Sequence, residues 1–130
     1  MQITLLRFAL CADAAATAAT GLLMAGAAGM LAQVTGIPAA FSLPVGLSLV
    51  AFAAFVGWVG WRAQTSRPLA MLVIAVNALW VVGSIVVLVA ALFPLTLLGT
   101  AFVLVQAVAV GALALLQQAG LAMAGRRALA

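Results

Sequence analysis

The chain carries few side chains that can do chemistry. Asp13 is its only acidic residue, Cys11 is its only cysteine, and there is no histidine among its 130 residues. Catalytic triads, Cys–His pairs, paired carboxylates and the usual zinc, haem or iron–sulfur sites all need more such residues. We therefore expect no enzymatic activity, no metal site and no cofactor.

Polar side chains inside apolar segments are usually the residues on which function in a membrane depends. Asp13, Asn77 and Gln117 lie about 9, 15 and 14 Å along their segments from the nearest arginine, at 1.5 Å per helical residue. Their similar depths predict that they meet in one layer. With neighbours on the same helix faces, the predicted intramembrane polar cluster is Asp13, Thr17, Thr20, Asn77, Gln106 and Gln117.

Asp13 itself has more than one interpretation. It can be structural, a protonated partner of Asn77 or Gln117 turned into the bundle, where an interhelical hydrogen bond contributes roughly 0.6 kcal/mol. It can instead be a proton- or cation-coupled site, or it can face the headgroups. Arg7 lies about 120° around the helix from Asp13, so the two do not form a simple ion pair. An isolated carboxylate there would cost at least about 2.5 kcal/mol.

The elements that position these residues must be membrane-spanning helices. The sequence is 69% apolar and 5% charged, whereas soluble domains carry about 25% charged residues. Ser42 and Ser66 are expected N-caps, each followed by a proline in the first turn. The chain, 1–130, is predicted to form one domain, an all-α integral membrane four-helix bundle. Its helices are expected over about residues 3–32, 44–61, 68–92 and 96–123.

The arginines predict the orientation of this bundle. With four spans, every arginine falls on one side, and the positive-inside rule makes that side cytoplasmic. Both the N-terminus and the C-terminus are therefore expected in the cytoplasm, with the protein in the bacterial inner membrane. The formal charge of +4 is too dispersed to predict a nucleic-acid partner. The expected membrane-interface anchors are Arg7, Trp58, Trp61, Arg62, Arg67, Arg126 and Arg127.

Small residues are expected to bring the helices into contact, because lipid offers no hydrophobic reward for helix association. Gly21, Ala25 and Gly29 fall four residues apart on one face of the first helix. This pattern predicts a close helix contact along that face and makes the first helix the most buried one. The alternative is an alanine-rich helix that faces lipid.

Two groups of proteins resemble the chain. It resembles a group of small uncharacterised bacterial integral membrane proteins through Arg7-Phe8-Ala9-Leu10 with Asp13-Ala14, Asn77-Ala78-Leu79-Trp80, and Gly99-Thr100-Ala101-Phe102-Val103 with Gln106. That resemblance covers nearly the whole chain and implies a four-helix inner-membrane protein with no assigned activity. The chain is also similar to small multidrug resistance transporters in length, helix number and a single acidic residue in the first helix. Asp13 stands where they have Glu, and their other motifs are not recognisable.

Three functions remain open at this point. The first is a non-enzymatic accessory or scaffold subunit that meets other membrane subunits, or further copies of itself, within the lipid bilayer. The second is a small oligomeric proton- or cation-coupled transporter or channel that uses Asp13. The third is the binding of a hydrophobic ligand such as a pigment, a quinone or a lipid, which the Trp and Phe content permits.

Overall fold

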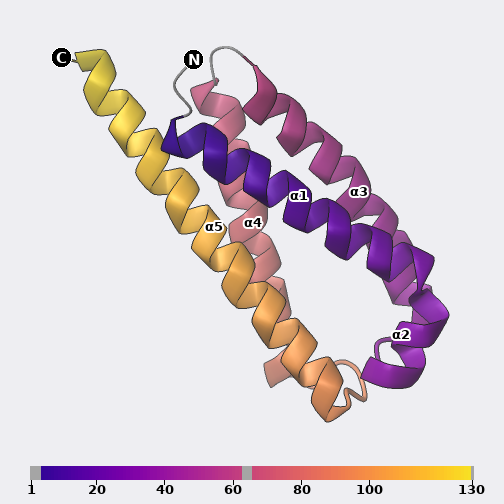
Figure 1. Cartoon of the computed structure of the whole chain (residues 1–130). Coiled ribbons are helices and arrows are strands. Elements are labelled where there is room, and N and C mark those ends of the chain that lie inside the picture. Colours follow the sequence, from indigo (N-terminus) through magenta and orange to yellow (C-terminus); the bar gives the residue numbers. More distant parts are fainter. Residues whose placement is uncertain (1–3, 63–65, 130) are drawn as a thin grey trace.

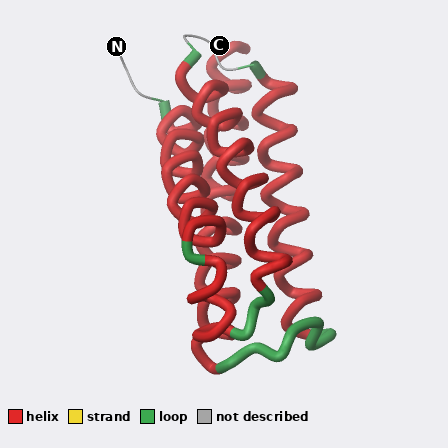
Figure 2. The backbone as a smooth tube through the Cα atoms, turned by 90° about the vertical axis from the view of Figure 1, so that its right-hand side faces the viewer, coloured by secondary structure: helices red, strands yellow, loops and turns green. Residues whose placement is uncertain are grey.

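The computed structural model describes residues 4–62 and 66–129, and the side chains of the last helix are described as far as Arg126. The described residues form helices and connecting turns, with no strand. All helices except α2 are long and apolar enough to cross a membrane, as expected of a multi-pass membrane protein. The helices, shown in Figures 1 and 2, are α1 (Leu5–Gly26), α2 (Ala28–Thr35), α3 (Ala39–Trp61), α4 (Arg67–Val89) and α5 (Leu97–Leu129).

The first two predicted helices have different bounds in the structure. The helix expected over 3–32 is interrupted at Ala27, where φ is −121° and ψ is 29°, and α2 continues in a new direction. The helix expected from residue 44 begins at Ala39, because Pro38 ends the preceding turn and occupies the N-cap position. Ser42 is therefore not an N-cap. It lies inside α3, where its buried hydroxyl donates to the Met24 carbonyl oxygen over 2.9 Å.

The last two predicted helices are closer to the observed ones. Ser66 precedes α4 at the N-cap position, but its side chain makes no capping hydrogen bond. Pro68 lies in the first turn, where its missing N–H removes no helical hydrogen bond. This helix ends at Val89 rather than at residue 92, and α5 extends to Leu129, beyond the expected end at residue 123.

Helices α1 and α3 lie side by side and run antiparallel (Figure 1). Their backbones touch, because a Cβ atom added to Gly46 would lie 2.5 Å from the Ala25 nitrogen and 2.7 Å from the Gly21 oxygen. Gly60 faces α1 near the other end of the pair, with its Cβ position 3.0 Å from the Leu10 Cβ. Glycine on both sides of a contact permits this approach in the membrane. Among the four membrane-length helices, α1 has the largest share of buried residues in its most apolar stretch.

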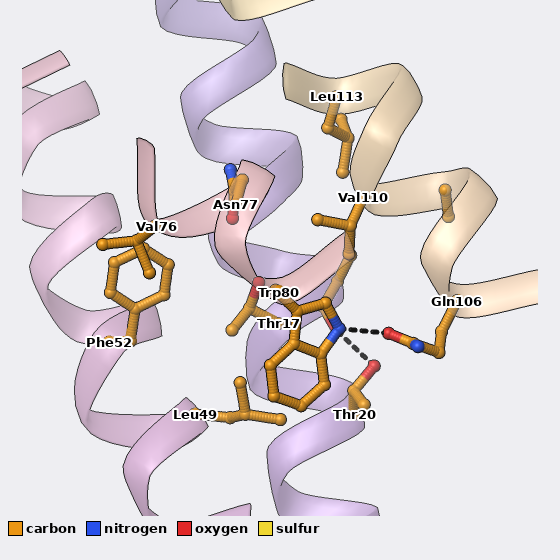
Figure 3. A pocket seen from close by; sticks show the side chains of 12 residues that line it. Thr17, Thr20, Leu49, Phe52, Val76, Asn77, Trp80, Gln106, Val110 and Leu113 are labelled. Carbon is orange, nitrogen blue, oxygen red and sulfur yellow. Dashed lines mark hydrogen bonds between the residues drawn. The ribbon is translucent and has the colours of Figure 1, made fainter. Parts of the chain in front are cut away.

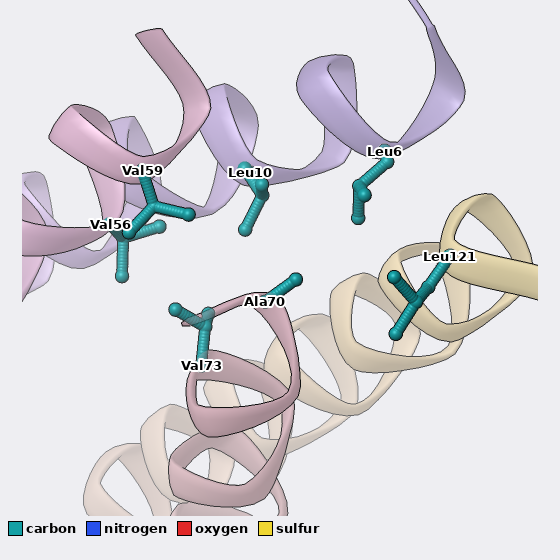
Figure 4. Close-up of a cluster of buried hydrophobic side chains, with 7 residues drawn as sticks. All are labelled: Leu6, Leu10, Val56, Val59, Ala70, Val73 and Leu121. Atoms are coloured by element: carbon teal, nitrogen blue, oxygen red, sulfur yellow. The ribbon is translucent and has the colours of Figure 1, made fainter. Parts of the chain in front are cut away.

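The long helices converge at the end of the molecule that carries both termini, here called the termini end (Figure 1). There α1, α3, α4 and α5 all contribute to one buried apolar cluster, in which the side chains point toward one another (Figure 4). Gly120 of α5 meets the α1 backbone here, with its Cβ position 2.6 Å from the Leu6 nitrogen. The cluster consists of Leu6, Leu10, Val56, Val59, Ala70, Val73 and Leu121.

At the opposite end, here called the α2 end, α1 and α5 diverge (Figure 1). Helix α2 bridges the gap. The Thr96 backbone N–H donates to the Thr35 oxygen over 3.0 Å, and the Thr96 hydroxyl donates to the Val34 oxygen over 2.6 Å. Gly36, in the left-handed region at φ 80°, and Gly99 both lie against backbone of the facing segment. The break at Ala27 is therefore what lets the chain turn back and fasten to the start of α5.

Candidate functional site

Four of the predicted polar residues meet in the structure. Asp13 and Thr17 of α1, Asn77 of α4 and Gln117 of α5 form what we call the polar layer, and all four are buried. One carboxylate oxygen of Asp13, Oδ2, accepts from Asn77 Nδ2 over 2.6 Å and from Gln117 Nε2 over 2.8 Å. The other oxygen, Oδ1, accepts from the Thr17 hydroxyl over 3.0 Å. The sequence-based prediction that Asp13 turns inward and bonds to Asn77 or Gln117 describes this geometry.

The orientation of the amides in the polar layer follows from the hydrogen bonds. Asn77 Nδ2 donates to Asp13 and also to Gln117 Oε1 over 3.2 Å, so both of its amide hydrogens are used. Gln117 accepts from Asn77 with its oxygen and donates to Asp13 with its nitrogen. The three groups thus close a ring of hydrogen bonds between three helices. Each partner of Asp13 is a neutral side chain, and each donates to it.

A small hollow of about 70 Å³ adjoins the polar layer on its α2-end side (Figure 3). Thr17 and Asn77 belong both to the polar layer and to the wall of the hollow. Thr20, predicted to join the cluster, also lines the hollow, but its hydroxyl donates to the Ala16 oxygen of its own helix over 2.9 Å. Polar residues of α1, α4 and α5 therefore line this space.

Gln106 belongs to a second polar group rather than to the polar layer. It lies eleven residues before Gln117, about 16 Å along α5 at 1.5 Å per residue. Its oxygen accepts from Trp80 Nε1 (Figure 3), and its nitrogen donates to Ser84 Oγ and to the Val103 oxygen, each over 3.0 Å. The Ser84 hydroxyl donates to the Trp80 oxygen over 2.8 Å. We call Trp80, Ser84 and Gln106 the polar trio.

The polar trio forms the polar edge of a larger apolar cleft of about 400 Å³. The cleft lies between the α1–α3 pair and the α4–α5 pair, where they diverge toward the α2 end. Phe41 and Phe93 lie at its wall with ring centroids 4.8 Å apart, and Phe102 also faces it. Apart from the polar trio, the remaining wall is made by apolar side chains and by Gly83 of α4.

The predicted interface anchors lie near the ends of helices, at the termini end of the molecule. Arg7 Nε donates to the Gly60 oxygen over 3.1 Å, which links α1 to α3. The Arg62 guanidinium lies over the Trp58 ring, 5.0 Å from its centroid. Trp61 is 80% exposed, as expected of a ring that meets lipid or headgroups. Arg67 and Arg126 are exposed, and the side chain of Arg127 lies outside the described residues.

The predicted packing residues divide into two groups. Gly21 and Ala25 contact α3 through Gly46, as described above. Gly29 was expected to continue this face, and the structure places it elsewhere. It lies in α2, beyond the break at Ala27, and a Cβ atom added to it meets no described heavy atom within 4 Å. The change of helix direction removes Gly29 from the contact.

Several residues that matter here were left out of the predicted site. Gly46 meets the small-residue face and Gly120 meets α1 at Leu6. Neither carries a signal of its own, because a glycine's neighbour cannot be identified from one sequence. Ser84 had a usable signal, since it lies seven residues after Asn77 on the same face of α4. Trp80 was not placed in the predicted polar cluster, and its indole N–H is the group that donates to Gln106.

No family model, no curated protein and no solved structure matches this chain.

Proposed function

We propose that this chain is a non-enzymatic multi-pass membrane protein that binds a lipophilic ligand in its cleft. The observation that carries the proposal is a space of about 400 Å³ with an apolar wall and a single polar edge. Small-molecule sites are typically concave, about 300–1,000 Å³ in volume, and apolar with a few placed polar groups. The cleft has each of these properties.

The aromatic residues favour a ligand with a planar ring. The chain has six Phe and three Trp, and four of these nine, Phe41, Trp80, Phe93 and Phe102, line the cleft. Aromatic rings prefer offset or edge-to-face contact with other rings, beyond the gain from buried area alone. A quinol-like or pigment-like ring therefore fits this wall better than an acyl chain does.

The polar trio adds a requirement on the ligand's polar group. All of its donors are engaged: the Trp80 indole N–H, both amide hydrogens of Gln106 and the Ser84 hydroxyl. Its acceptors are only half used, because Gln106 Oε1 and Ser84 Oγ each accept one hydrogen bond and have capacity for two. The ligand we propose accordingly carries a hydroxyl or another donor on its ring.

We further propose that the long helices form a four-helix bundle in a bacterial inner membrane, with both termini in the cytoplasm. The support is the position of the arginines, which lie in the first turn of α1, at the end of α3, at the start of α4 and in the last turns of α5. In this orientation the polar layer lies in the cytoplasmic half of the bilayer. The cleft and α2 lie in the opposite half.

An accessory or scaffold role predicts a different result when the protein is purified from its native membrane. Such a subunit brings a stoichiometric partner protein out of the membrane, whereas a ligand-binding protein brings a small molecule. We would extract the full chain from its native membrane in a mild detergent, record its visible and ultraviolet absorbance, and analyse the extract by mass spectrometry for lipophilic molecules and for proteins.

Gly83 offers a variant that fills the cleft without damaging the fold. It lines the cleft, and its Cβ position meets no described heavy atom within 4 Å. Gly83→Leu should abolish ligand recovery, while the matched control Gly29→Leu, which is also in open space but outside the cleft, should retain it. Equal recovery from both variants, or a wild-type extract with the composition of the bulk membrane, would refute the proposal. A stoichiometric partner protein in place of a ligand would favour the accessory role.

A further inference from the structure

We propose that Asp13 and Thr17 form a reversible proton-binding site that exchanges with water in the adjoining hollow. This site is separate from the cleft and does not depend on the ligand proposed above. The observation that carries it is the unequal environment of the two Asp13 oxygens, one held by fixed amide donors and the other by a hydroxyl.

The geometry selects the oxygen that receives the proton. Oδ2 accepts two amide N–H groups, over 2.6 and 2.8 Å, and an amide nitrogen has no lone pair that could accept in return. A proton on Oδ2 would displace at least one of these bonds. Within the polar layer, Oδ1 is bonded to the Thr17 hydroxyl alone, and a hydroxyl both donates and accepts. The proton therefore binds at Oδ1.

Both protonation states fit the same arrangement of side chains. In the ionised state the Thr17 hydroxyl donates to Oδ1, as in the structure. In the protonated state an O–H bond forms on Oδ1 and donates to Thr17 Oγ1, while the Thr17 hydrogen rotates away. The bonds from Asn77 and Gln117 to Oδ2 remain in place. One proton is taken up from water, the charge of Asp13 changes from −1 to 0, and the only hydrogen bond that changes is the one between Oδ1 and Thr17, which reverses direction.

The charged and titratable groups around the polar layer lie near the helix ends. Helix α3 contains none, and α4 has only Arg67, at its first residue. Helix α5 has only Arg126 and Arg127, in its last turns. On α1, Arg7 lies about 9 Å along the helix from Asp13 and donates to the Gly60 oxygen, and Cys11 is exposed on another face. The described hydrogen-bond partners of Asp13 are therefore neutral side chains.

Thr17 provides the route between the carboxyl and water. It donates to Asp13 on one side and lines the hollow on the other. The hollow's volume of about 70 Å³ exceeds the roughly 10–15 Å³ that one water molecule needs. Thr17, Asn77, Thr20 and Gln106 supply the polar groups that such water requires. A proton can thus reach Oδ1 through Thr17 without movement of a helix.

The sequence makes the test direct, because Asp13 is the only acidic side chain. We would reconstitute the full chain in phosphatidylcholine vesicles and record infrared spectra over a pH series. Spectra of Asp13→Asn, subtracted at each pH, remove the terminal carboxyl. We expect the carbonyl stretch of a protonated carboxyl to appear and disappear in one reversible step, and to shift in D₂O. A band that is absent at every pH, or constant at every pH, would overturn the proposal.

A second pair of variants tests the route. Thr17→Val removes the hydroxyl between Oδ1 and the hollow, and should slow hydrogen–deuterium exchange of the carboxyl by about tenfold, the effect of one lost hydrogen bond. Ser48→Ala removes a hydroxyl that lies outside the hollow and donates to the Pro44 oxygen of its own helix over 2.9 Å, and it should leave the rate unchanged. Exchange in Thr17→Val at the wild-type rate would contradict the assignment of Thr17.

Discussion

Replacing Asp13 by Ala should destabilise the protein by about 2 kcal/mol. The substitution removes two interhelical hydrogen bonds, from Asn77 and Gln117, and one within α1, from Thr17. Interhelical hydrogen bonds in membranes average about 0.6 kcal/mol each, and a typical hydrogen bond within a protein contributes about 0.5–1.5 kcal/mol. The bond between Asn77 and Gln117 survives, so these two residues are not left without partners. The loss falls on the contacts that tie α1 to α4 and α5.

Asp13→Asn should cost much less, roughly 0.5 kcal/mol or below, about the value of one such bond. The new amide can be oriented in only one way. Its oxygen must take the place of Oδ2, because two donors point at that position. Its nitrogen then faces Thr17 and donates to the hydroxyl, which reproduces the geometry of a protonated Asp13. All three contacts of the residue are thereby retained.

The assay is reversible unfolding of the purified protein in mixed micelles, with increasing sodium dodecyl sulfate and circular dichroism as the readout. Ser48→Ala serves as a control outside the polar layer, with an expected change near zero, because its hydroxyl is exposed and donates to the Pro44 oxygen of its own helix. An Asp13→Ala variant as stable as the wild type would show that the polar layer does not hold the helices together. An Asp13→Asn variant as unstable as Asp13→Ala would show that charge, rather than hydrogen-bond geometry, is what the layer requires.

Two further predictions concern packing and orientation. Gly46→Ala should destabilise the protein by roughly 1–3 kcal/mol relative to the control Gly83→Ala. The methyl added at Gly46 lies 2.5 Å from an α1 backbone nitrogen, whereas Gly83 faces open space. Equal unfolding free energies of the two variants would mean that α1 and α3 are not in backbone contact. In a Cys11→Ser background, cysteine at Gln33 should react with a membrane-impermeant reagent from outside and cysteine at Ser66 only from inside. Labelling of position 66 from outside would reverse the proposed orientation.

The polar layer was predictable from the sequence because its background is so apolar. In a chain with one carboxylate and few amides, depth along each helix is enough to match Asp13 with Asn77 and Gln117. The same reasoning was wrong for Gln106, which shares a helix face with Gln117 but lies three turns away. Two residues on the same helix face point in the same direction, but they meet the same neighbours only if they also lie at the same depth in the bundle.

The break at Ala27 and the cleft were not predictable. The segment from Ala25 to Ala32 contains no proline and reads as a continuation of α1. Its interruption follows from tertiary contacts, since α1 is fixed against α3 at Gly21 and the chain is fixed again to α5 at Thr35. Both contacts depend on which helices are neighbours. Which helices become neighbours depends on packing across the whole molecule, and no local sequence pattern predicts it.

The cleft between the helices stays open because the helices are held together at its two ends and not between them. Lipid gives apolar helices no reason to close on one another, so they meet only where small or polar residues hold them. The polar layer holds the pairs together toward the termini end, and Thr96 with α2 holds them at the other. Between these points α4 approaches α1 without backbone contact among the described residues. Membrane lipid is the default occupant of such a space, so selectivity for any other ligand must come from the polar trio and the aromatic wall.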